Sequence, residues 1–182
     1  MRKMWFSAAV LLLCVFLLSG CGSDPLDYDT AMGLLKDKNT EPVKLTFSAT
    51  IPRGNDIRLS AAYGQLIDAH VLACTENPAM GEICRPGPSG DAISQAGSAE
   101  LSFAAGRWVP ATILKISRSG GGAAVADVRM TFEPTPMYRD FQAAFDQIQT
   151  LSGRDVVTKG DGKVMRASFQ RYDDGWHLDS ID

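Results

Sequence analysis

Regular alternation of apolar and polar residues dominates the second half of the chain. Between 124 and 133, Ala124, Ala126, Val128, Met130 and Phe132 alternate with mostly polar neighbours. A period of two is typical of a strand with one buried face, so a strand is predicted there. The same pattern predicts strands over 43–51, 101–103, 108–117, 155–159, 163–172 and 175–181.

Glycine and proline divide these strands. The run 119–122 is Ser-Gly-Gly-Gly and predicts a hairpin turn between 108–117 and 124–133. Gly106 is interpreted as a turn between 101–103 and 108–117. Pro110 lacks an N–H, which predicts an edge position or a bulge. The final strands are joined by Gly160-Asp161-Gly162 and Asp173-Asp174-Gly175.

Helical spacing appears in three places. Residues 25–38 begin with Asp24-Pro25, which favours a helix capped by Asp24. Residues 136–151 place Met137, Phe141 and Phe145 on one face, and Gly153 suits the end of that helix. The stretch 57–73 favours a helix capped by Asp56, with a pair of strands as the alternative. Gly64 would cost that helix about 1 kcal/mol.

Residues 75–98 are rich in Gly, Pro and Ser and show no clear period. They are predicted to form a long loop, and long loops inside compact domains are often functional. This loop is therefore the first place to expect a binding site.

These elements together predict an α+β fold. The economical arrangement is an antiparallel β-sheet with helices packed on one face. A cystatin-like or nuclear-transport-factor-like fold is an architectural analogy, and no residue motif supports it.

The beginning of the chain has a different character. Arg2 and Lys3 precede an uncharged run from Trp5 to Leu18 that is about as long as a signal-peptide core and short for a membrane span. Leu18-Ser19-Gly20-Cys21 follows and resembles the lipobox of bacterial lipoproteins. The resemblance covers these 21 residues only. An uncleaved signal anchor is the alternative.

The resemblance implies cleavage before Cys21 and lipidation of its sulfur and amino group. Acyl chains such as palmitate, three in all, would give near-permanent attachment, since each buried methylene contributes about 0.8 kcal/mol. The expected organisation is a signal peptide over 1–20, a lipidated tether over 21–24 and a single periplasmic domain over 25–182. In enteric lipoproteins, an Asp directly after the lipidated cysteine resembles a signal for retention at the inner membrane. This chain has Gly22 at that position, which favours location at the outer membrane.

The net charge of the mature chain limits the kinds of partner that it could bind. Removing Arg2 and Lys3 with the leader leaves sixteen basic against twenty-one acidic side chains, a net charge of −5. The basic residues are scattered, so we expect no nucleic-acid partner.

The expected compartment determines the expected state of the cysteines. Cys14 would leave with the signal peptide and Cys21 would carry lipid, so Cys74 and Cys84 remain as a pair in an oxidising environment. We predict a disulfide between them. Their spacing does not match a redox or zinc motif, and neither His70 nor His177 completes one.

Candidate chemistry is sparse, and the sequence contains no nucleophile elbow, phosphate loop or metalloprotease motif. His177 and Asp179 share a strand face, so the Asp179 carboxylate could orient the His177 imidazole as a general base. No nucleophile or metal accompanies them, so a surface hydrogen bond is the simpler interpretation. His70 is interpreted as a partly buried residue. Asp161, Asp173 and Asp174 are better explained by turns than by calcium. Four aromatic residues could line a ligand surface or belong to the core: Trp108, Tyr138, Tyr172 and Trp176.

We therefore predict no enzymatic activity, no catalytic residues, no metal and no cofactor. The hypothesis is a membrane-anchored envelope lipoprotein that acts as a binding or assembly module for an envelope protein partner. The alternative is an inhibitor or immunity-type lipoprotein that neutralises a secreted enzyme. The short tether suggests a domain close to the bilayer.

Overall fold

A computed structural model describes residues 25–38, 41–154 and 162–182. The fold is mixed α+β and consists mostly of strands. Its larger sheet is antiparallel and curled, with the order β1-β6-β7-β8-β9 and a two-residue β5 beside β6. A second antiparallel sheet has the order β2-β4-β3. The expected antiparallel α+β class is confirmed.

The large sheet is built around two long strands. It comprises β1 (Val43–Ser48), β5 (Ser94–Gln95), β6 (Glu100–Ser119), β7 (Ala123–Pro134), β8 (Lys163–Tyr172) and β9 (Gly175–Ile181). The small sheet comprises β2 (Thr50–Ile51), β3 (Leu72–Asn77) and β4 (Gly81–Pro86). The helices are α2 (Tyr28–Asp37), α3 (Ile57–Asp68), α4 (Pro136–Asp140) and α5 (Gln142–Leu151).

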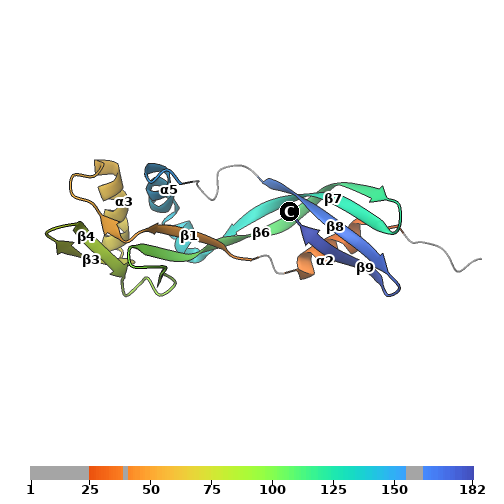
Figure 1. Cartoon of the computed structure of the whole chain (residues 1–182), viewed down its shortest axis with the longest axis horizontal. Coiled ribbons are helices and arrows are strands. Elements are labelled where there is room, and N and C mark those ends of the chain that lie inside the picture. The colour runs from red at the N-terminus through yellow and green to blue at the C-terminus, as the bar shows by residue number, and fades with distance from the viewer. Residues whose placement is uncertain (1–24, 39–40, 155–161) are drawn as a thin grey trace, which may run out of the picture.

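The molecule is elongated and has a lobe at each end of the β6–β7 ribbon (Figure 1). We call one the hairpin lobe: it holds β1, the small sheet, α3, α4, α5 and the beginning of β6. The other, the meander lobe, holds α2, β8, β9 and the paired ends of β6 and β7. Each lobe has its own cluster of buried hydrophobic side chains.

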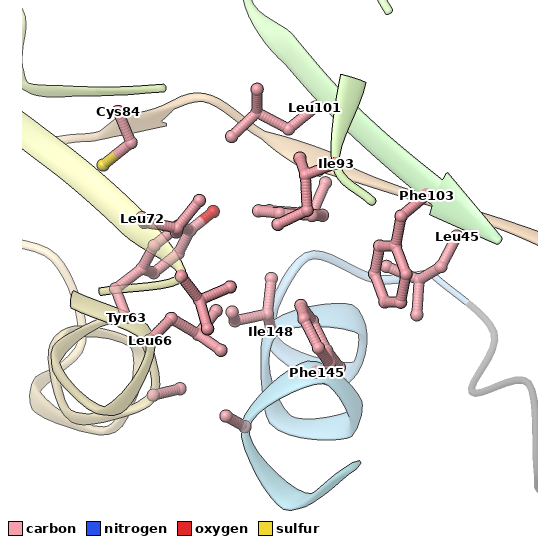
Figure 2. Close-up of a cluster of buried hydrophobic side chains, with 14 of the residues drawn as sticks. Leu45, Tyr63, Leu66, Leu72, Cys84, Ile93, Leu101, Phe103, Phe145 and Ile148 are labelled. Atoms are coloured by element: carbon pink, nitrogen blue, oxygen red, sulfur yellow. The ribbon is translucent and has the colours of Figure 1, made fainter. Parts of the chain in front are cut away.

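Figure 2 shows the core of the hairpin lobe, where side chains of two helices face those of the strands. Tyr63 and Leu66 come from α3, and Phe145 and Ile148 come from α5. Tyr63 also donates a hydrogen bond from its hydroxyl to the Ser48 carbonyl, at 2.7 Å. Its burial raises the pKa of its phenol well above the usual value.

The meander lobe is packed by small residues on the strands and by one amphipathic helix. Ala124, Ala126 and Val128 of β7 are almost completely buried, and Ala31 and Leu35 of α2 lie in the same cluster. The packing of all helices on one face of the sheet is not confirmed, because α2 belongs to this core while α3, α4 and α5 belong to the other.

The helix predicted over 25–38 is present as α2, but its cap is different. The Asp27 carboxylate, not Asp24, accepts the Thr30 N–H at 2.7 Å, which holds the pKa of Asp27 below its usual value. Asp24 lies outside the described residues. Leu26, directly before this cap, is buried in the core of the meander lobe.

The strand predicted over 43–51 is divided between two sheets. β1 ends at Ser48, and β2 begins at Thr50 and pairs with β4. The Ser48 hydroxyl bridges this break by donating to the Thr50 carbonyl and accepting the Thr50 N–H. Alternation continues across the break, so the pattern alone does not reveal it.

Four further differences concern turns and ends. The helix predicted over 57–73 is confirmed as α3 with Asp56 as its cap, but it ends at Asp68 and β3 starts at Leu72. The expected loop over 75–98 is wrong, because the second half of β3, all of β4 and all of β5 lie within it. The helix predicted over 136–151 is divided at Phe141, whose φ of −120° departs from helical values.

The turn predicted at Gly106 is also wrong, since β6 runs through it without interruption. A Cβ at Gly106 would lie 2.3 Å from the Glu133 carbonyl oxygen and 2.5 Å from the Phe132 ring. This glycine therefore allows close strand contact and makes no turn. The bulge expected at Pro110 is confirmed by a register shift between Pro110 and Thr112.

The hairpin at 119–122 and the strands 163–172 and 175–181 are confirmed. The strand predicted over 155–159 lies outside the described residues.

Candidate functional site

The disulfide-linked hairpin β3–β4 is the first candidate site, and it lies at the end of the hairpin lobe (Figure 1). Cys74 and Cys84 are directly opposite each other, with Cα atoms 4.0 Å apart, and their sulfur atoms are bonded. Cys84 is buried in the core and Cys74 is half-buried. The predicted disulfide is therefore present, and the segment it closes is a β-hairpin instead of an irregular loop.

The turn of this hairpin is specified by Asn77 and Gly81. The Asn77 side-chain oxygen accepts the N–H groups of Ala79 and Met80, at 2.9 and 3.2 Å. This is a common use of Asn in turns. Gly81 has a φ of +103°, and a Cβ there would lie 2.2 Å from the Ile51 carbonyl oxygen. The turn therefore presents Met80, which is 54% exposed.

A polar cavity of about 250 Å³ lies beside the hairpin. Its lining comes from the β2–α3 connection, the first turn of α3 and the tip of the hairpin: Ile51, Pro52, Arg53, Gly54, Asn55, Ser60, Glu76, Gly81 and Glu82. Arg53 forms an ion pair with Glu76, with Nη2 and Oε1 2.9 Å apart, and both side chains are exposed.

Two features of this cavity indicate which kind of ligand it would bind. Glu76 and Glu82 are directly opposite each other across β3 and β4, and with Arg53 they leave one net negative charge. The Nδ2 atom of Asn55 is buried and has no hydrogen-bond partner within the described ranges, while its Oδ1 accepts the Ser60 hydroxyl at 2.7 Å. Buried amide groups normally have a partner. The cavity thus favours positive charge and a hydrogen-bond acceptor.

A second cavity of about 550 Å³ lies where the two lobes meet. It is lined by the end of β7, the adjoining part of β6 and the chain before β1: Pro42, Ala104, Gly106, Arg107, Glu133, Pro134 and Thr135. The Arg107–Glu133 ion pair, at 3.1 Å, is half-exposed, and such pairs contribute little to stability. The Glu133 carboxylate is paired with Arg107, and the Thr135 hydroxyl donates to the Ala104 carbonyl at 3.0 Å, so the groups with possible chemistry here already have partners.

The histidines provide no catalytic arrangement. His177 Nε2 lies 2.9 Å from Asp174 Oδ1, in the β8–β9 turn, so its partner is Asp174 and not Asp179. The hydrogen bond with His177 lowers the pKa of Asp174. His70 is exposed with a φ of +58°, so the interpretation of a partly buried residue is wrong. It follows the last turn of α3, where the chain reverses into β3.

The carboxylates and aromatic residues do not converge either. Asp173 and Asp174 form the β8–β9 turn, and Asp161 lies outside the described residues. Within those residues, no three His, Cys, Asp or Glu side chains are arranged to hold a metal ion. Tyr138 is buried in the hairpin lobe, Trp108 and Trp176 pack on the meander core, and Tyr172 is 59% exposed beside His177.

The residues that line the polar cavity were missed by sequence reasoning. Arg53 and Asn55 belong to a segment predicted only as a turn, and Glu76 and Glu82 belong to the segment predicted as a loop. They meet because β4 pairs with both β2 and β3. The available signal was the spacing of Cys74 and Cys84 about Asn77 and Gly81, which is compatible with a hairpin.

Cys21 and the lipobox lie outside the described residues. Among the residues described, no helix combines the length and the apolar character needed to cross a membrane. No family model matches the chain, and neither a curated protein nor a solved structure matches it.

Proposed function

We propose that this protein is a bacterial envelope lipoprotein, anchored through Cys21 in the outer membrane and facing the periplasm, that acts as a non-enzymatic binding or assembly module. The observation that supports this proposal most directly is the separation between the start of the domain and the stapled hairpin. Leu26 packs in the meander core, whereas Leu72 and Cys84 pack in the hairpin core.

The separation gives the module reach. β6 has 20 residues, which at roughly 3.3 Å per residue correspond to at most about 65 Å. If Cys21 is embedded in the bilayer, α2 and the meander lobe lie nearest to the membrane. The hairpin lobe then extends outward, so a short tether does not confine the hairpin to the bilayer surface.

The finer fold assignment is also proposed. Support for helices on one face of the large sheet comes from β7, where Met130 packs in the meander core and Phe132, two residues later, contacts the hairpin core. Residues two apart in a strand share a face. Both cores then lie on one face of a twisted ribbon. A cystatin-like or nuclear-transport-factor-like fold stays a prediction.

The anchor is tested by Cys21→Ser. We expect the variant to remain an unprocessed precursor and to lose its acyl label in cells given a radiolabelled fatty acid. Unchanged processing and labelling would contradict the lipoprotein assignment. Cys14→Ser is the matched control, since the expected signal peptide contains Cys14, and it should leave lipidation unchanged.

The binding role is tested by photocrosslinking in living cells. A photoreactive amino acid replaces Met80 at the hairpin tip or Val164 on β8, which are 54% and 53% exposed. We expect one discrete adduct from position 80 and none of similar yield from position 164. Equal yields at both positions, or no adduct at either, would contradict a module that binds through the hairpin lobe.

The alternative, an inhibitor or immunity-type lipoprotein, is favoured by one observation. The hairpin is rigidified by its disulfide, and a rigid projecting segment can enter a cleft at low entropic cost. If the protein crosslinked at position 80 is an enzyme whose activity falls when the lipoprotein is added at equal concentration, inhibition is the function. Undiminished activity leaves the assembly role.

A further inference from the structure

We propose that the outer edge of β3 is a docking edge for an extended segment of a partner protein, which adds a strand to the small sheet and places a basic side chain beside Glu76. This inference rests on the proposed binding function and names the site and the chemistry of its occupant. Three observations support it: the β3 backbone groups that point away from β4, the side chains that reach the edges of the large sheet, and the negative charge around Glu76.

The backbone groups of alternate β3 residues point away from the sheet. Cys84 donates its N–H to the Ala49 carbonyl, on the β2 side of β4. Because the N–H and C=O of a strand residue point to the same side, the Cys84 backbone forms no hydrogen bond with the Cys74 backbone. The Cα separation of 4.0 Å fits a non-hydrogen-bonded pair joined by its disulfide. The bonded pairs are therefore the residues on either side, and Leu72, Cys74 and Glu76 direct their backbone groups outward.

The accessible outward backbone groups have no hydrogen-bond partner among the described residues. They are the N–H and C=O groups of Cys74 and Glu76. Leu72, at 2% exposed, is buried in the hairpin core and lies outside the accessible part of the edge. Two donors and two acceptors alternate along the accessible edge, which is the recognition pattern of another strand.

In the large sheet, side chains form hydrogen bonds with backbone carbonyls of both edge strands. The Thr46 carbonyl of the edge strand β1 accepts hydrogen bonds from Gln149 at 2.9 Å and from Arg154. At the opposite edge, the Asp179 carbonyl of β9 accepts the Lys38 ammonium at 3.5 Å. A side chain from a neighbouring segment thus reaches one carbonyl on each of these edges, whereas no side chain of the described residues reaches a β3 carbonyl.

The edge also lacks several of the features that prevent strand addition, although it carries one charged residue, Glu76. Leu72–Asn77 contains no proline, glycine or lysine, and its pairing with β4 has no register shift. Natural edge strands are commonly blunted by such residues or by bulges. The disulfide holds β3 on β4.

Charge selects the occupant. Glu76 is flanked by Glu82 across the sheet and shares Arg53, leaving one net negative charge at this end of β3. A residue of an added strand directly opposite Glu76 would lie beside Glu76, with Glu82 one strand further away on β4. Opposite charges stabilise such cross-strand pairs, so a strand with Arg or Lys at that position is favoured over one with an acidic residue.

The test uses the full-length chain in detergent micelles and a fluorescent probe peptide of seven residues, alternating Val and Thr with a central Arg. Fluorescence anisotropy measures affinity, and hydrogen–deuterium exchange measures protection of 72–77. A peptide with a central Glu tests charge. A peptide with alternate backbone amides methylated tests strand addition, because methylation removes donors but keeps the side chains.

Three variants of the chain are compared. Glu76→Gln keeps the edge and removes the charge, Glu76→Pro removes an outward N–H without breaking a ladder bond, and Glu41→Gln is an exposed control. We expect Glu76→Gln to weaken the arginine peptide about two- to five-fold, Glu76→Pro to weaken it at least about ten-fold, and Glu41→Gln to have no effect. Protection should rise over 72–77 and not over 175–181.

Several results would overturn the proposal. They are an absence of binding up to about 1 mM of the arginine peptide, equal binding of the methylated peptide, or protection outside 72–77. A concentration-dependent dimer that Glu76→Pro abolishes would assign the edge to a second copy of this chain instead. If Glu76→Pro fails to fold by circular dichroism, Glu76→Gln and the methylated peptide still decide the outcome. Failure here, with a crosslink at Met80 retained, would reject this edge without rejecting the binding function.

Discussion

Trp108 on β6 and Phe132 on β7 lie directly opposite each other, with ring centroids 5.3 Å apart in an edge-to-face arrangement. Trp108 packs on the core of the meander lobe, and Phe132 packs on the core of the hairpin lobe. This pair is therefore where the two cores touch through side chains. It couples the lobes that β6 and β7 already connect through their backbones.

Replacing Phe132 with Ala should lower the free energy of unfolding by about 2 kcal/mol, less than for a fully buried phenylalanine because this ring is half-buried. Guanidinium unfolding followed by tryptophan fluorescence and by far-ultraviolet circular dichroism measures it. We also expect the two transitions to separate, since the contact between the cores is lost. Coincident transitions with unchanged stability would show that the backbone alone couples the lobes.

Gly106→Ala should destabilise the fold by about 2 kcal/mol, because a Cβ would collide with the Glu133 carbonyl and the Phe132 ring. Gly64→Ala is the matched control: it lies within α3 and a Cβ there meets nothing within 4 Å. That variant should gain about 0.5–1 kcal/mol through helix propensity. Thermal unfolding of both variants checks the opposite signs, and a loss of stability in both would contradict the contact argument.

The disulfide should stabilise the chain by about 3 kcal/mol, according to the entropy of a closed loop of this length. The double variant Cys74→Ala, Cys84→Ala should show this loss in guanidinium unfolding, and reductant should reproduce it in the parent protein. Reductant should leave the double variant unchanged. A parent protein insensitive to reductant would indicate that the sulfur bond contributes nothing measurable.

Stability should fall in acid partly through Asp56. Its carboxylate accepts hydrogen bonds from the Arg58 side chain and backbone, which lower its pKa from 3.8 to about 2. The folded pKa is depressed, so this contribution is complete above about pH 4 and is lost as the pH falls towards 2. Asp56→Asn keeps a helix cap that does not titrate.

The free energy of unfolding of Asp56→Asn should therefore depend less on pH between 4 and 2 than that of the parent. Asp27 and Asp174, whose pKa values are also lowered, titrate in both proteins and cancel in the comparison. Parallel curves for parent and variant would remove Asp56 from the acid response.

The sequence predicted most of the strands and helices because their signals are local. Alternation from Ala124 to Phe132 follows from one buried face of β7, and Asp56 caps α3 through its own neighbouring backbone. The pairing of Cys74 with Cys84 followed from counting the cysteines that remain if the lipobox resemblance holds and the chain is exported. None of these inferences requires knowledge of what the segments pack against.

The sequence by itself determined the α+β class, the disulfide partners and the helix cap at Asp56. Only the tertiary structure decided that the alternating run 43–51 serves two sheets, that Gly106 is a point of close contact and that Glu76 meets Glu82 and Arg53. The physical reason is range: propensity and capping act within a few residues, whereas sheet pairing is set by contacts between distant segments. The open edge of β3, on which the docking proposal depends, is such a consequence of pairing.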